Sequence, residues 1–136
     1  MDLDAARAFV AQNSQTVVTT LRKDGSPAMS PVNVAVFDDG TYVISSRETA
    51  YKVKNLRRDP RVTYTAMNDA FFGEWAQIDG AAEIVSLPDA MDGLVEYYRS
   101  TGGEHPDWDD YRAAMVREQR VLIAITPERA GPNVSG

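Results

Sequence analysis

The sequence predicts a small, mainly β domain in which antiparallel strands close into a barrel and a few helices pack around it. Three observations support this prediction: β-branched runs separated by tight-turn sequences, a change to helical spacing in mid-chain, and two further helical segments before a final strand. The chain has 136 residues, close to the most common domain size. We therefore expect a single domain, with residues 127–136 as a polar, glycine-containing tail.

The first half of the chain is predicted to form one helix and three strands. Residues 2–12 are expected to be a short helix with acidic side chains in its first turn. Thr16–Leu21 and Ala28–Phe37 are predicted strands on either side of the turn sequence Lys-Asp-Gly-Ser. Asp38-Asp39-Gly40 is a second turn, and Thr41–Ser46 is the third strand. Strands joined by tight turns form an antiparallel meander.

Helices and strands alternate in the second half. The apolar positions of residues 49–58 have helical spacing, and this helix is expected to stop at Asp59-Pro60 because the residue before proline avoids the helical region. Gly80 is expected to mark a bulge or bend in a strand. The remaining predicted elements are strands at 61–67, 75–85 and 120–126 and helices at 88–100 and 106–118. Closure of these strands into a barrel would remove the exposed sheet edges, giving about six antiparallel strands with three or four helices.

Composition excludes several classes of protein. The chain has no cysteine, which excludes disulfides, thiol chemistry and cysteine-ligated metals. No apolar run approaches the roughly 20 residues of a membrane-spanning helix, and the acidic first residues do not resemble a signal peptide. The net charge of -6 argues against nucleic-acid binding, which usually needs a basic surface. We therefore expect a cytoplasmic protein without a membrane span.

One segment departs from this acidic character. Residues 47–61 hold six of the 14 basic residues, and they run from a strand end into a helix start, where free N–H groups favour an anion. Lys52 falls near the first helical turn, where a cation is unfavourable unless an anion is close. A structural alternative is also open: Ser45 and Glu48 fit a capping box, and the lysines are then ordinary solvated charges. The spacing alone favours this alternative.

Other features give no protein-based catalytic group and no metal site. Residues 31–36 form an apolar strand with an amide at Asn33, and Trp75 and Gln77 share one strand face; packing explains both patterns as well as ligand contact does. The single histidine, His105, precedes a helix start and is expected to have a loop or capping role. Hydrolase triads are thus poorly supported, and a bound cofactor is expected to supply any chemistry.

The sequence resembles a known superfamily in several segments. Val17–Leu21, Asp24–Pro27, Pro31-Val32 and Lys52–Arg61 are similar to the pyridoxamine 5'-phosphate oxidase-like split barrels. Tyr98-Arg99, residues 103–112 and Met115 resemble the actinobacterial branch of flavin/deazaflavin oxidoreductases (class B) that use coenzyme F420. Nearly the whole chain is covered.

The resemblance implies an FMN-binding-like split barrel that forms a homodimer, with cofactor sites at the subunit interface. A chain this short also has limited interior in which to enclose a flavin-sized molecule alone. The residues implied in phosphate binding are Lys52, Ser45, Ser46, Lys54 and Asn55. The residues implied along the tricyclic ring are Pro31, Val32 and Asn33, with Trp75 and Gln77 reaching the neighbour's site. Ala50 stands where relatives often have an arginine, so either Arg47 replaces that arginine or phosphate affinity is lower.

The function implied by this resemblance is hydride transfer from reduced coenzyme F420 to a flat conjugated enone, lactone or quinone. The proton then comes from solvent or from a nearby tyrosine or serine hydroxyl. Two alternatives remain open: an FMN-dependent enzyme of the same fold, and a non-catalytic carrier of a flavin, haem or bilin. Pyridoxamine 5'-phosphate oxidase itself is less favoured, because the additional basic and histidine substrate residues of that enzyme are not evident.

Overall fold

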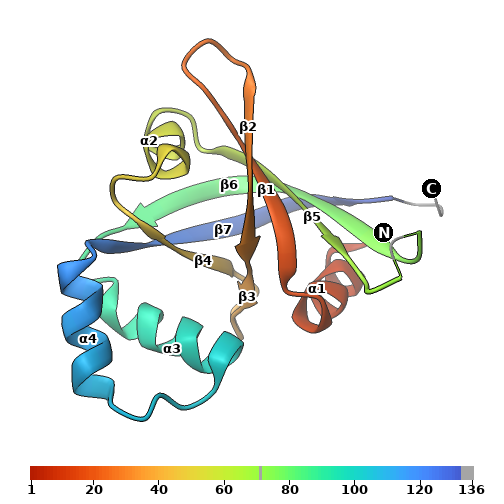
Figure 1. The fold of residues 1–136 in the computed structure, drawn as a ribbon. Helices are drawn as coiled ribbons and strands as arrows, with labels where there is room; N and C mark the ends of the chain where they lie inside the picture. The colour runs from red at the N-terminus through yellow and green to blue at the C-terminus, as the bar shows by residue number, and fades with distance from the viewer. Residues whose placement is uncertain (71, 133–136) are drawn as a thin grey trace.

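A curled antiparallel sheet and four helices make up the computed structural model, which describes residues 1–70 and 72–132 (Figure 1). The helices are α1 (Leu3–Gln12), α2 (Tyr51–Arg58), α3 (Met91–Gly102) and α4 (Trp108–Arg117). The strands are β1 (Gln15–Leu21), β2 (Pro27–Asn33), β3 (Ala35–Val36), β4 (Tyr42–Arg47), β5 (Arg61–Met67), β6 (Trp75–Val85) and β7 (Arg120–Gly131). The mainly β fold class predicted from the sequence is confirmed.

The order of the strands explains why the sheet curls. The order is β2-β1-β5-β6-β7-β4-β3, and the paired strands are antiparallel. Strands β2 and β3 lie at opposite ends of this order, yet only Val34 separates them in the chain. The Val34 N–H donates to the carbonyl of Ser14 just before β1, which fixes this crossing point (2.9 Å). The two edges of the sheet therefore approach each other, as in a split barrel.

Two buried clusters hold the elements together. The barrel interior is filled by apolar and aromatic side chains from the strands, and α1 closes it with the fully buried Ala6 and Val10. The second cluster joins α3 and α4 to the outer side of β4 and β7, around Val43, Leu94 and Leu122. Burial of this kind is the main stabilising contribution in a domain of this size.

Two strand predictions need correction. The predicted strand at residues 28–37 is interrupted at Val34, because its first part pairs with β1 and its last part with β4. The final strand continues past residue 126 to Gly131, although Pro127 has no N–H to donate. A register shift at Gly80 accommodates this proline, and a Cβ at Gly80 would overlap the carbonyl oxygen of Thr126. The predicted bulge at Gly80 is therefore confirmed.

The helices differ from prediction at their ends: each starts one to three residues later, α3 ends at Gly102 instead of Ser100, and α4 ends at Arg117 instead of Glu118. Helix α3 begins at Met91 and α4 at Trp108, where the Asp107 carboxylate accepts from the N–H of Asp110 (3.1 Å). His105 accepts from the Asp107 N–H through Nδ1 (2.9 Å), in agreement with its predicted loop role. Among residues 1–70 and 72–132, the helices are too short or too polar to cross a membrane.

Candidate functional site

The basic segment identified in the sequence lies where β4 leads into α2. Strand β4 pairs with the first part of β7, so that Ser45 faces Leu122 and Arg47 faces Arg120 across the ladder. Ser45 is half-buried, whereas Ser46 is buried with 3% of its surface exposed. The ladder therefore brings two arginines from distant parts of the chain to the start of α2.

The start of α2 has no capping side chain. Ala50 is the N-cap residue and makes no side-chain cap hydrogen bond, so the predicted capping box of Ser45 and Glu48 is wrong. Ser45 remains inside β4, and the Glu48 carboxylate instead pairs with Arg57 at 2.8 Å. The first backbone bonds into the helix come from Val53 and from the next residue, both to the Ala50 carbonyl. The earlier N–H groups of this turn are therefore available to an anion.

Lys52 is the most unusual charge of this segment. Its side chain is half-buried, and burial, followed by the nearby Arg120 charge, lowers the pKa of its ammonium group. Within the described part of the chain it has neither a hydrogen bond nor an ion pair, and no carboxylate offsets it. A partly desolvated ammonium beside a guanidinium is unfavourable alone but favourable once a dianion binds between them.

The charge that acts on the Lys52 ammonium is that of Arg120. The Arg120 guanidinium donates to Glu118 Oε1 through Nη2 (2.9 Å) and Nε (3.2 Å), which holds it in place. Arg47 reaches the same oxygen at 3.4 Å, and the hydrogen bonds from Arg120 lower the pKa of Glu118. Sequence reasoning missed Arg120, because only the β4–β7 pairing brings it to the start of α2.

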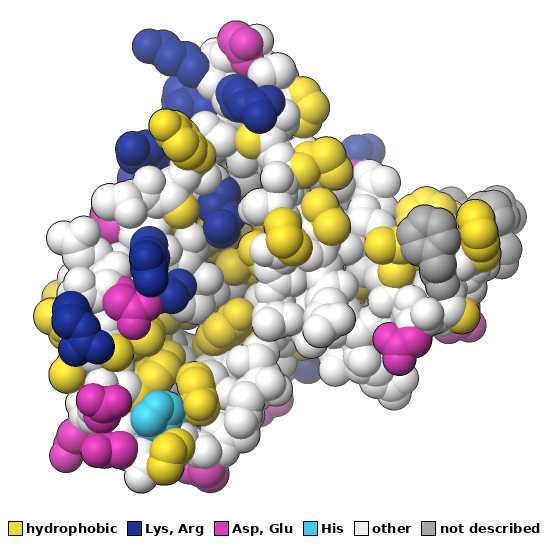
Figure 2. All heavy atoms as spheres, viewed as in Figure 1, with side chains coloured by type: hydrophobic (Ala, Val, Ile, Leu, Met, Phe, Trp, Pro, Cys, Tyr) yellow, Lys and Arg dark blue, Asp and Glu magenta, His cyan; other side chains and the backbone are white. Residues whose placement is uncertain are grey.

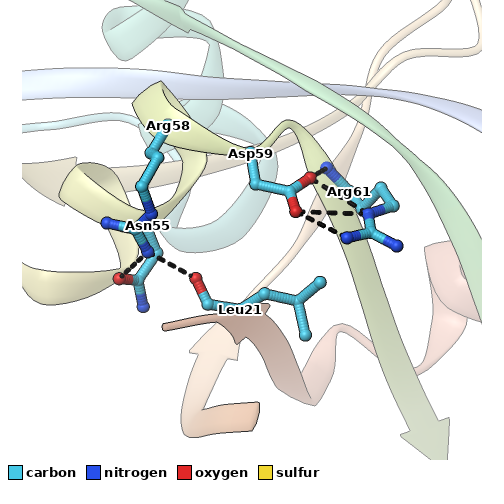
Figure 3. A network of polar contacts seen from close by, with 5 residues as sticks. All are labelled: Leu21, Asn55, Arg58, Asp59 and Arg61. Carbon is cyan, nitrogen blue, oxygen red and sulfur yellow. Dashed lines mark hydrogen bonds and ion pairs between the residues drawn. The ribbon is translucent and has the colours of Figure 1, made fainter. Parts of the chain in front are cut away.

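Lys54 and Asn55 lie elsewhere on α2. Lys54 is exposed, with Nζ 5.2 Å from the ring centroid of Tyr51. Asn55 is buried, and its amide donates to Thr20 Oγ1 at 3.1 Å. Its carbonyl oxygen accepts from Arg58 at 3.1 Å, and the same guanidinium reaches the Leu21 carbonyl (Figure 3). Both ends of the Asn55 side chain therefore attach the helix to β1.

The residues predicted to lie along a ring belong to the end of β2. Pro31 and Asn33 are exposed and Val32 is half-buried, and all three line a cavity of about 500 Å3 with β1 and the start of the β5–β6 loop. The Tyr97 hydroxyl donates to the Asn33 carbonyl (2.9 Å) and also lies beside the N–H of Ser45. This phenol thereby links the predicted ring strand to the predicted phosphate strand.

Trp75 and Gln77 are not brought to the Lys52 region within one chain. They line a separate cavity of about 260 Å3 on β6 and β7, together with Asp79 and Arg129. Gln77 donates to Asp79 (3.2 Å), and Arg129 lies 2.6 Å from the same carboxylate. Their contact with a neighbouring subunit's site stays a prediction.

Basic, acidic and hydrophobic side chains occupy different parts of the surface around the junction, the segment where β4 leads into α2. Figure 2 shows basic side chains gathered over α2 and the β1–β2 hairpin, and hydrophobic side chains in the hollowed region between α2 and the α3–α4 pair. Acidic side chains gather near α4, at the lower left of the same view. One face therefore offers a positive rim next to an apolar floor, which suits a ligand with a phosphate and a ring.

Comparison with protein families decides the relationship. The family model described as pyridoxamine 5'-phosphate oxidase matches residues 3–132. The chain belongs to this family. Members of the pyridoxamine 5'-phosphate oxidase family bind flavin-type cofactors, and this membership agrees with the split-barrel topology.

Solved structures give the same fold. A conserved hypothetical protein of Mycobacterium tuberculosis is 26% identical, with 96% of this chain and 82% of that chain covered and a TM-score of 0.78. An F420 reductase is 19% identical over 92% of this chain and 94% of its own, with a TM-score of 0.71. General Stress Protein 26 from Bacillus anthracis is 16% identical over 96% and 92% of the two chains, with a TM-score of 0.65.

Proposed function

We propose that this protein is an oxidoreductase that binds coenzyme F420 and passes a hydride from its reduced form to a conjugated planar acceptor. The observation that carries the proposal is the half-buried Lys52 ammonium at the uncapped start of α2, where the Arg120 charge helps to lower its pKa and no residue among 1–70 and 72–132 gives it an anionic partner. A cofactor phosphate is the group that this pair of cations fits.

The residues at the junction suit a phosphate in three ways. Lys52 and Arg120 supply positive charge, and the uncapped start of α2 supplies backbone N–H donors. Ser45 adds a half-buried hydroxyl on the strand that leads into α2. Buried Ser46 and Asn55 support the strand and the helix that present these groups.

The remaining residues orient and shield the ring. A phosphate held at the start of α2 directs the rest of the molecule across the apolar hollow toward Pro31, Val32 and Asn33. When bound, a reduced deazaflavin supplies the hydride, so the protein needs no strong acid or base of its own. The chain contributes mainly binding and orientation, and solvent supplies the proton.

A second subunit completes the site in this proposal. The cavities along β2 and β6 are open to solvent in one chain, and a flavin-sized ring needs cover on both faces. Trp75 and Gln77 would then cover the ring held by the neighbouring chain. The resemblance of residues 103–112 to the F420-dependent branch favours the deazaflavin over FMN.

A parallel titration of the purified protein with coenzyme F420 and with FMN tests the cofactor. We expect micromolar or tighter binding of F420 and weaker binding of FMN. Replacement of Lys52 by alanine is expected to cost about 1.5–3 kcal/mol of binding free energy if its charged hydrogen bond is made. Lys54→Ala is the matched control, because it removes the same charge from an exposed position of the same helix.

Turnover tests the reaction itself. Reduced F420 mixed with the protein and menadione, or a coumarin, is expected to regain the absorbance of the oxidised deazaflavin. Failure to bind F420 at micromolar concentration would end the proposal. Equal losses in Lys52→Ala and Lys54→Ala would show that the phosphate does not lie at Lys52.

One observation also admits an FMN-dependent enzyme as the second candidate function. In this proposal Lys52 and Arg120 bind a phosphate, and FMN carries a phosphate as well. This candidate predicts a yellow protein on purification that binds FMN more tightly than F420. Tight binding of either cofactor without turnover would instead indicate a carrier.

A further inference from the structure

The turn between α4 and β7 has an unusual backbone conformation. Gln119, its middle residue, has a φ of 54°, in the left-handed region that residues other than glycine seldom adopt. The N–H of Glu118, the residue before it, donates to the Ala114 carbonyl at 2.8 Å, which fixes the end of α4 at this turn. A strained residue persists where the surrounding structure holds it, often beside a functional group. The side chains on either side of Gln119 belong to Glu118 and Arg120.

Glu118 uses one carboxylate oxygen to bind two arginines. Its Oε1 accepts from Arg120 Nη2 at 2.9 Å and Nε at 3.2 Å, and it lies 3.4 Å from Arg47 Nη2. The two arginines face each other across the β4–β7 ladder, where their charges would otherwise repel. The hydrogen bonds from Arg120 lower the pKa of Glu118, which keeps the carboxylate ionised. Arg120, with two hydrogen bonds and 26% of its side chain exposed, is held more firmly than Arg47, which is 59% exposed.

The same turn is bonded to the connection between β4 and α2. The Glu48 N–H donates to the Gln119 carbonyl at 2.9 Å, two residues before the N-cap residue Ala50. Backbone contacts therefore set the place of Arg120 relative to the start of α2. The Arg120 charge acts on Lys52 in the first turn, where it adds to burial in lowering the pKa of that ammonium. The turn thus presents a restrained guanidinium to the uncapped helix start.

A guanidinium that is restrained before its ligand arrives binds a phosphate better than a free one. A long side chain loses rotamer freedom when it binds, and Arg120 has already lost much of that freedom to Glu118. Arginine has five N–H donors, and the bonds from Nε and Nη2 to Glu118 use two of them. The other donors can serve a phosphate.

We propose that Glu118 is a positioning residue for the cofactor phosphate: through its bonds to Arg120, it orients the guanidinium that binds this phosphate at the start of α2. This inference rests on the proposed function, in which Arg120 is one of the groups that hold the phosphate. Glu118 acts through Arg120 alone, and its own negative charge opposes the binding of an anion.

The two effects of Glu118 have opposite signs, which makes its role testable. If the carboxylate is only a nearby negative charge, Glu118→Gln strengthens phosphate binding and Glu118→Asp changes little. If it holds Arg120, both variants weaken binding, because Gln lacks the charge that strengthens the hydrogen bonds and Asp is one methylene too short. We expect each variant to raise the Kd for coenzyme F420 about fivefold. The Kd for the ribityl deazaflavin, which lacks the phosphate, is expected to stay unchanged.

Two comparisons test whether the effect runs through Arg120. Glu48→Gln is the matched control, because Glu48 also pairs with an arginine near α2 (Arg57, 2.8 Å) but makes no side-chain bond to Arg120 in the part of the chain that the structure describes. This control is expected to leave the Kd for F420 unchanged. Arg120→Ala is expected to weaken F420 binding, and adding Glu118→Gln to it is expected to cause no further loss.

A measurement without a cofactor tests the hold on Arg120 directly. The Arg120 Nε–H is bonded to Glu118, so we expect Glu118→Gln to speed its exchange with solvent about tenfold in an NMR experiment. Arg120→Lys assigns the signal, because lysine has no such group. Equal exchange rates in wild type and Glu118→Gln would overturn the inference whether or not F420 binds.

The outcomes separate this inference from the proposed function. Tighter F420 binding by Glu118→Gln, together with weaker binding by Lys52→Ala, would overturn the positioning role and leave the proposed function in place. If F420 does not bind, the proposed function fails, and the Glu118 variants are then compared with FMN and riboflavin, which differ only in the phosphate. Equal FMN affinities of wild type and Glu118→Gln would overturn the inference in that case. Failure to bind either cofactor would overturn both.

Discussion

The two ends of helix α2 treat their charges in opposite ways. At the last turn, Arg58 donates to the Leu21 carbonyl at 2.8 Å and to Asn55, and the following Asp59 pairs with Arg61 at 2.7 Å (Figure 3). At the first turn, Lys52 is half-buried beside another cation with no carboxylate to offset it.

The difference separates an end whose charges are paired within the chain from an end that suits the proposed phosphate. A single helix of eight residues thus has a fully paired network at one end and an uncapped, positively charged start at the other. Paired charges at an exposed helix end fix the chain locally and add little else. A desolvated charge without a partner costs stability in the free protein, and such positions concentrate at binding sites.

The largest effect on stability is expected from Asn55 at the structural end. Asn55→Ala removes the donor to Thr20 and leaves a buried hydroxyl without this bond, so we expect the free energy of unfolding to fall by about 2 kcal/mol. Urea denaturation measures this loss. A double-mutant cycle with Thr20→Val checks the cause, because the double mutant should lose less stability than the sum of the two single-mutant losses.

A smaller effect, on cofactor affinity, is expected from Tyr97, whose hydroxyl lies beside β4, the strand that leads into the first turn of α2. Tyr97→Phe removes its bond to the Asn33 carbonyl, and we expect F420 affinity to fall by about 1 kcal/mol. Tyr98→Phe is the matched control, because the Tyr98 hydroxyl has no hydrogen bond within the residues that the structure describes. Equal affinities for the two variants would mean that the link between β2 and β4 does not position the cofactor.

Replacement of Lys52 is expected to have a small, pH-dependent effect on the stability of the free protein. The pKa of Lys52 is lowered in the folded state by burial and by Arg120, so the unfolded chain binds more protons between that pKa and the ordinary value of 10.5. The stability of the free protein therefore rises with pH through this window. Lys52→Met should be at least as stable as wild type at pH 7 and should lose that rise. A Lys52→Met protein that unfolds more easily at pH 7 would show that the ammonium is structural.

The smallest effect is expected at Arg61. Its guanidinium is 76% exposed, so Arg61→Ala is expected to leave the unfolding midpoint within measurement error, despite the close pair with Asp59. Thermal melts at low and high salt check this. A clear fall in the melting temperature of Arg61→Ala at low salt, but not at high salt, would show that the pair stabilises the turn after α2 more than an exposed pair usually does.

Local patterns made most of the fold predictable. The hairpin turn at Gly25 is a case in point: its φ of 86° favours glycine, and the Asp24 carboxylate accepts from the Ser26 N–H at 3.0 Å. The prediction stopped β7 too early, because Pro127 usually ends a strand, and only the partner bulge at Gly80 allows it to continue.

The candidate site was less predictable, because it is assembled across the sheet. Lys52 belongs to a local motif and was identified, whereas Arg120 and Tyr97 reach it from β7 and α3. No local spacing indicates that the Arg120 charge acts on Lys52. The capping prediction for Ser45 was wrong because β4 runs on to Arg47 and α2 starts only at Tyr51, too far from Ser45 for it to be the N-cap.

The single residue between β2 and β3 has one more consequence. Because Val34 alone joins the two strands, β2 cannot slide along β1 without displacing β3 and, through it, β4. Strand pairing through β3 and β4 and the Tyr97–Asn33 hydrogen bond therefore connect the surfaces beside Asn33 and Ser45. A ligand that spans both surfaces meets them already aligned, and little of its binding free energy is lost in ordering the protein.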